Sequence, residues 1–160
     1  MDRTLLEGAN DSAFVLSLKG WGKTNPTRVH QADDWIDVSI RVSSSTGDWS
    51  HEGELLTAAE TNWLANWLEA IALRRKYDRK VDFAEPDFSF RIIDESQDTV
   101  LLRVYFEGRG RPTWARKDLA EDRDIWIDLN LHRRDFEHAA ASVRSELASI
   151  DGVERENARP

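Results

Sequence analysis

The stretch from Trp35 to Val42 reads Trp-Ile-Asp-Val-Ser-Ile-Arg-Val, and its pattern decides the fold class. Aliphatic residues stand at 36, 38, 40 and 42, and polar or aromatic residues stand between them. This period of two predicts a β-strand with one face buried. The turn-forming segment 43–48 follows, so the arm from Trp49 to Leu56 completes a predicted hairpin.

The same alternation recurs along the chain and predicts four more strands. They cover residues 14–18, 88–92, 100–106 and 125–131. An antiparallel sheet with one covered face fits such alternation, so we expect the aliphatic side of each strand to face the helices.

Two helices are predicted between and after these strands. The first begins with Thr57-Ala58-Ala59-Glu60, which has the spacing of a capping box. Its apolar stripe contains Trp63, Leu64, Trp67, Leu68 and Ile71, so Trp63 and Trp67 are expected in the core. We place the cations Arg74, Arg75 and Lys76 in its last turn, where they complement the helix dipole. The second helix runs from Phe136 to Ile150, and Asp151-Gly152 is expected to end it.

The predicted order β-β-β-α-β-β-β-α places the strands in runs that are each closed by a helix. Runs of strands followed by helices are typical of an α+β fold. We therefore predict a six-stranded, largely antiparallel sheet with two helices packed on one face. Residues 1–150 form a single domain in this prediction, and residues 151–160 form a charged, flexible tail.

Composition narrows the class of protein. The chain has 160 residues, a formal net charge of -8 and no cysteine, so disulfides and thiolate metal sites are excluded. The acidic balance argues against direct binding of nucleic acid. No apolar run is long enough to span a membrane, and the first ten residues lack the apolar segment of a signal peptide. We expect a cytoplasmic protein.

No catalytic motif emerges from the residues. The four histidines lack the spacing of a zinc site, and Ser43–Ser45 is not a nucleophile elbow. Gly108–Pro112 lacks a third glycine and is interpreted as part of a long loop, 108–123. The sequence predicts no catalytic residue, metal or cofactor. One alternative stays open: an enzyme or small-ligand-binding domain that uses Asp37 and Asp128, which share the polar side of their strands.

The seven tryptophans suggest partner binding as one of two equally weighted interpretations. Several large aromatics lie among arginines and carboxylates, which is the composition of binding hot spots. The predicted contact residues are Trp35, Asp37, Trp49, Arg103, Tyr105, Trp126 and Asp128. The competing interpretation is that these rings only cover the outer sheet face, under loops such as 108–123. A self-associating adaptor is a further alternative.

Several segments together resemble a known family. Gly22–Pro26 is similar to a Gly-x-x-x-x-Pro loop but has three residues between the glycine and the proline, and Asp34–Ile40 matches the Asn/Asp-Trp-Leu/Ile-x-Val-x-Ile strand that follows such a loop. The matching segments that follow are Trp49–Glu54, Glu60–Leu68, Phe83–Phe90, Ile125–Leu131 and Phe136–Leu147. In this order, from about Phe14 to Ile150, the chain resembles the WapI-type immunity proteins of bacterial polymorphic-toxin and contact-dependent inhibition systems.

The resemblance implies a small cytoplasmic protein that binds and blocks a secreted toxin domain, often a nuclease. Such a protein needs no catalytic residues. Nuclease toxins tend to be basic because they hold phosphates, and a chain with a net charge of -8 is complementary to one. The expected partner is therefore a cognate toxin domain of basic character.

Overall fold

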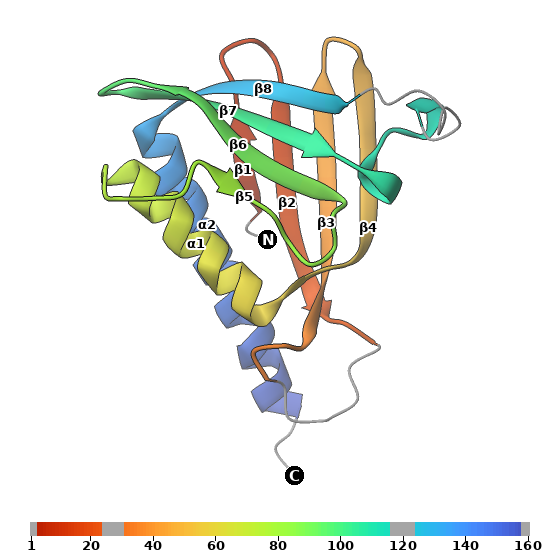
Figure 1. Cartoon of the computed structure of the whole chain (residues 1–160). Helices are drawn as coiled ribbons and strands as arrows, with labels where there is room; N and C mark the ends of the chain where they lie inside the picture. Colours follow the sequence, from red (N-terminus) through yellow and green to blue (C-terminus); the bar gives the residue numbers. More distant parts are fainter. Residues whose placement is uncertain (1–2, 24–30, 116–123, 158–160) are drawn as a thin grey trace.

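The computed structural model describes residues 3–23, 31–115 and 124–157, with side chains up to residue 150. Its strands form two antiparallel sheets of four, which cross over one another, and two helices lie along one side of the pair (Figure 1). The element order is β-β-β-β-α-β-β-β-β-α, with two short 3-10 turns before the last strand.

The first sheet is a meander in the order β1-β2-β3-β4. Its strands are β1 (Thr4–Glu7), β2 (Ala13–Trp21), β3 (Trp35–Ser44) and β4 (Gly47–Thr57). The predicted strand and hairpin are confirmed, since β3 and β4 pair from Trp35↔Thr57 to Ser44↔Gly47. Gly47 makes the tight connection possible because its φ of 137° is rarely adopted by residues with a side chain.

The second sheet repeats this arrangement in the order β5-β6-β7-β8. Its strands are β5 (Lys80–Val81), β6 (Phe88–Glu95), β7 (Thr99–Phe106) and β8 (Ile125–His132). The turns η1 (Gly108–Gly110) and η2 (Thr113–Ala115) follow β7. The expected loop 108–123 therefore begins with these turns, and its remainder, 116–123, lies outside the described residues.

The prediction of one six-stranded sheet is wrong, although the α+β class is confirmed. Two strands, β1 and β5, were missed because each is too short to show a repeated alternation. The strands that precede α1 in the sequence also form one sheet, and the strands that follow it form another. Alternation identifies which side of a strand is buried, but the same pattern results whether that side faces a helix or another sheet.

The helix α1 spans Ala58–Ala72, and its predicted capping box is present. The Thr57 hydroxyl accepts from the Glu60 backbone N–H at 3.1 Å, and the Glu60 carboxylate accepts from the Thr57 N–H at 3.0 Å. Two expectations for this helix are wrong. Trp67 is buried, but Trp63 is 42% exposed because it lies beside the buried stripe. Arg74 follows the helix end with a φ of 55°, so the cations 74–76 lie outside the last turn.

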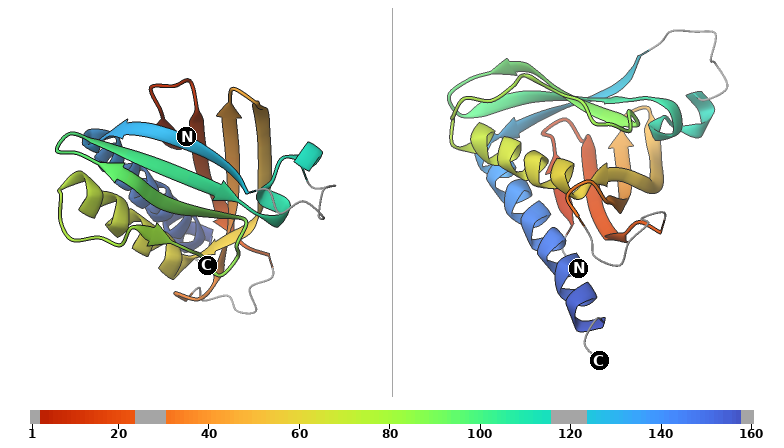
Figure 2. Two further views of the ribbon diagram at one scale, coloured as in Figure 1. Left: turned by 45° about the horizontal axis from the view of Figure 1, so that its top comes forward. Right: turned by 60° about the horizontal axis from the view of Figure 1, so that its bottom comes forward.

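The helix α2 spans Arg133–Asn157 and follows β8 directly. It continues through Asp151-Gly152, so the predicted stop at this pair is wrong. A glycine weakens a helix by only about 1 kcal/mol, which permits the helix to continue. The two helices pack against each other, and α2 also packs against β1 and β2 (Figure 2).

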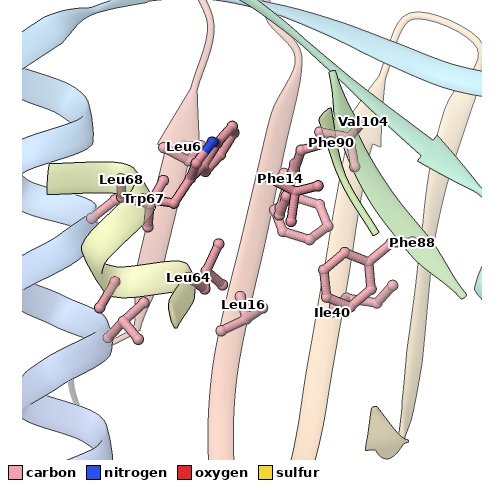
Figure 3. Close-up of a cluster of buried hydrophobic side chains, with 14 of the residues drawn as sticks. Leu6, Phe14, Leu16, Ile40, Leu64, Trp67, Leu68, Phe88, Phe90 and Val104 are labelled. Atoms are coloured by element: carbon pink, nitrogen blue, oxygen red, sulfur yellow. The ribbon is translucent and has the colours of Figure 1, made fainter. Parts of the chain in front are cut away.

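The core lies between the two sheets and is closed on one side by the helices. The ring of Phe14 on β2 lies 5.6 Å from Phe88 and 5.7 Å from Phe90 on β6. Trp67 of α1 stacks on Phe90 at 5.7 Å, so both sheets and a helix meet at these rings (Figure 3). Burial of each such side chain contributes roughly 1.5–3 kcal/mol. Among the described helices, none is long and apolar enough to cross a membrane.

Candidate functional site: an aromatic and charged sheet face

The outer face of the second sheet gathers four of the predicted contact residues. Alternation turns Val104 and Ile127 inward, so Arg103 and Tyr105 on β7 and Trp126 and Asp128 on β8 turn outward. The strand register then places Arg103 opposite Asp128, and Tyr105 opposite Trp126. Residues from separate parts of the chain are thereby brought into one cluster.

The Arg103–Asp128 pair holds this cluster in a defined geometry. Arg103 Nε donates to Asp128 Oδ1 at 2.7 Å, and Nη2 donates to Oδ2 at 3.0 Å. These bonds raise the pKa of Arg103 above its usual range, so the guanidinium remains charged. A bidentate pair is more rigid than a single ion pair, so it fixes the plane of the guanidinium.

Aromatic rings cover the fixed guanidinium group. The Cζ atom of Arg103 lies 4.8 Å from the centroid of the Trp126 ring, which is cation–π distance. The rings of Tyr105 and Trp126 are 5.9 Å apart. Trp126 is still 45% exposed, so the cluster presents a large aromatic surface to solvent.

The cluster extends onto β6 through a residue that was not predicted as part of the site. Arg91 lies 5.6 Å from the centroid of Tyr105 and donates to the carboxylate of Asp82 at 3.1 Å. The sequence pattern could have identified this residue, because Arg91 is on the polar side of its strand. We call these six residues the aromatic face: Asp82, Arg91, Arg103, Tyr105, Trp126 and Asp128.

Two further predicted contact residues, Trp35 and Asp37, lie on the outer side of the first sheet. Asp37 is directly opposite Glu54, and the next outward residue of β4 is Glu52. Partial burial raises the pKa of Asp37, and the charges of Glu54 and Glu52 raise it further, while Lys23 lowers it. We call Asp37, Glu52 and Glu54 the acidic face. Like charges directly opposite one another weaken a sheet.

The seventh predicted contact residue, Trp49, lies apart from both faces. It pairs with Val42 and therefore turns inward, where its ring packs 5.1 Å from Phe106. Its Nε1 donates to the Gly110 carbonyl at 2.9 Å, and the ring of Trp114 lies 5.8 Å away. The structure thus places Trp49 at the rim of the core, where it holds the η1 turn against β4.

The carboxylate alternative receives no support from this arrangement. Asp37 and Asp128 belong to different sheets, and their side chains are on the two opposite outer faces. The interpretation that the two carboxylates lie on the face of one common sheet is wrong, because β3 and β8 belong to different sheets. Within the described part of the chain, no three His, Asp or Glu side chains gather in a way that could hold a metal ion.

An exposed aromatic and charged face on a rigid sheet is typical of a protein that binds another macromolecule. Comparison with known protein families agrees with this class. The chain belongs to the immunity protein WapI-like family, whose match covers residues 5–151. No curated protein and no solved structure matches the chain.

Proposed function

We propose that this chain is an immunity protein that binds a cognate bacterial toxin domain and blocks it by stoichiometric occlusion. Family membership supports a toxin as the partner. The aromatic face is the observation that carries the binding mechanism, because exposed Trp126 is held in place by Tyr105 and Arg103. Rigid aromatic residues lose little entropy on binding and dominate interface energies.

The two ion pairs of the aromatic face make it nearly neutral. Asp128 balances Arg103, and Asp82 is shared between Arg91 at 3.1 Å and the neighbouring Lys80 at 3.3 Å. We therefore assign it to short-range contact, in which Trp126 and Tyr105 lose water against an apolar part of the toxin. Removal of such a contact mainly accelerates dissociation of a complex.

The acidic face has a different role in this proposal. Together with the net charge of -8, Asp37, Glu52 and Glu54 attract a basic toxin such as a nuclease over a distance of about 8–10 Å in physiological salt. This attraction raises the rate of association, and added salt weakens it. The protein would act in the cytoplasm, where a toxin that has entered the cell meets its target.

A neutralisation experiment tests the function. The C-terminal domain of the protein encoded just upstream is expressed with and without this chain, and growth and co-purification are scored. We expect growth arrest without the chain, and rescue with a one-to-one complex in its presence. Toxicity without rescue or binding would contradict the proposal.

A further inference from the structure

A groove of about 620 Å³ lies on the side of the molecule where β1, the end of β8 and the first half of α2 meet. Figure 1 shows β1 at the margin of the first sheet, on the side where the helices lie. The walls include Leu5 and Glu7 of β1, His132 at the end of β8, and His138 and Ser142 of α2. None of these residues belongs to the aromatic or acidic face.

The strand register directs part of the β1 backbone into this groove. Gly8 N–H donates to the Ser12 carbonyl at 2.8 Å, which makes Gly8 and Ser12 a hydrogen-bonded pair of the hairpin. Such pairs alternate in antiparallel strands, so Leu6 and Thr4 also bond to β2. The N–H and C=O groups of Leu5 and Glu7 therefore point away from β2. No backbone hydrogen bond among the described residues reaches them.

The neighbouring edge of β8 closes only one end of this opening. Ala9 N–H donates to the Asn130 carbonyl at 3.4 Å, and the Asn10 side chain donates to the Asp128 carbonyl at 3.0 Å. Further along, at the end of β8, the His132 N–H is already bonded to the Asp135 carboxylate of α2 at 2.8 Å. The backbone groups of Leu5 and Glu7 thus remain beside a space that neither β8 nor α2 fills.

The groove also offers an apolar contact. Leu5 is 48% exposed, and the buried residues Leu131 and Ala139 also line the groove. A row of backbone donors and acceptors beside an apolar patch matches an extended peptide, which pairs its backbone with an edge strand and seats alternate side chains. Leu5 on its own strand supplies the surface for one such apolar side chain.

We propose that an extended segment of the toxin adds to the open edge of β1 in this groove, pairs with Leu5 and Glu7, and seats an apolar side chain on Leu5. This inference rests on the proposed function and adds a second, backbone-mediated contact to the aromatic face. The pairing requires an extended backbone and one apolar residue from the toxin, and it makes few demands on the remaining toxin sequence.

Substitution by proline isolates the backbone contact. Glu7→Pro deletes an N–H that the fold does not use, and proline is tolerated on edge strands where its N–H would face outward. Glu7→Ala is the matched control, because it removes the same side chain and keeps the N–H. With the upstream-encoded toxin domain as probe, we expect Glu7→Pro to weaken the complex at least tenfold and Glu7→Ala to weaken it less than threefold.

Amide hydrogen exchange on the wild-type complex tests the same contact without a variant. We expect the Leu5 and Glu7 amides to exchange rapidly in the free protein and to become protected in the complex. A wild-type complex with unprotected amides, and with equal affinity for both Glu7 variants, would overturn the groove assignment and leave the immunity function intact. Failure of the wild-type chain to bind or rescue would overturn both.

Discussion

At the scale of single residues, the charged side chains on the outer faces of the two sheets have different effects on the stability of the fold. The carboxylates of the acidic face are crowded, since Asp37 stands directly opposite Glu54. The arginines of the aromatic face are each paired with a carboxylate. On the acidic face, repulsion from Glu54 and Glu52 acts on Asp37 and is offset in part by Lys23, while on the aromatic face carboxylates hold the arginines.

Trp126→Ala tests the aromatic face. We expect it to weaken the toxin complex by about 2 kcal/mol or more, mainly through faster dissociation, because a fixed aromatic contact is lost. Thermal stability should change little, since Trp126 is 45% exposed. The matched control is Trp63→Ala, because Trp63 is 42% exposed and belongs to α1 instead of the second sheet. An equal loss of affinity in both variants, or a loss of folding in Trp126→Ala, would contradict this role.

Asp37→Asn tests the acidic face through pH and salt. The folded state raises the pKa of Asp37, so it favours the protonated carboxyl and disfavours the ionised one. The ionised Asp37 carboxylate therefore destabilises the folded state. This destabilisation is absent at a pH low enough to protonate Asp37 in both the folded and the unfolded state, and it is complete above the raised pKa. At neutral pH we expect Asp37→Asn to stabilise the fold by a few tenths to about 1 kcal/mol. Chemical denaturation at acid and neutral pH measures the difference.

The same substitution should slow toxin association and reduce its salt dependence. Asp33→Asn, which removes one charge from an exposed position before β3, is the control for net charge. Unchanged association kinetics and unchanged salt dependence in Asp37→Asn would count against steering by this face.

At the scale of elements, one arginine ties three segments together. Arg133, the first residue of α2, donates to the Ile71 carbonyl near the end of α1 at 2.8 Å. It also donates to the carbonyls of Ser96 at 2.6 Å and Gln97 at 2.9 Å, in the turn between β6 and β7. At the helix end, Arg133 adds a charge-assisted hydrogen bond to a carbonyl that also accepts from the Arg74 N–H at 3.2 Å, and in the turn it donates to two more carbonyls.

Arg133→Ala should destabilise the fold by about 2–3 kcal/mol, because several charge-assisted hydrogen bonds are lost together. Arg134→Ala is the control, since Arg134 is an exposed neighbour with the same charge. Urea denaturation measures both variants. Equal midpoints would show that the bonds of Arg133 contribute nothing, while toxin affinity should be the same for all folded variants.

Local patterns predicted the elements well, and non-local arrangement could not be predicted from them. The inward residues of β3 and the capping box of α1 follow from neighbours within a few positions. The same holds for the aromatic face, because its four predicted members all lie on the polar side of their strands. The partition into two sheets depends on contacts such as Phe14 with Phe88, which are far apart in sequence. The inward position of Trp49 could not be predicted, because a tryptophan can lie on either side of an edge strand.

At the scale of the whole molecule, both sheets and both helices share one core. We therefore expect Phe14→Ala to lower the free energy of unfolding by about 3–5 kcal/mol and to shift a single transition. Circular dichroism and tryptophan fluorescence should report the same midpoint. Two separate transitions would show that residues 1–150 do not unfold as one domain.

The alternation of β7 and β8 places residues that stabilise the core and residues that face outward at neighbouring positions. Val104 and Ile127 maintain the interior, while Tyr105 and Trp126, one position away, point to whatever lies outside. Because the two kinds of residue alternate, substitutions at every second position can change the outward side chains without disturbing the core. An immunity protein whose toxin partner changes during evolution can thus change its outward residues and keep its core residues.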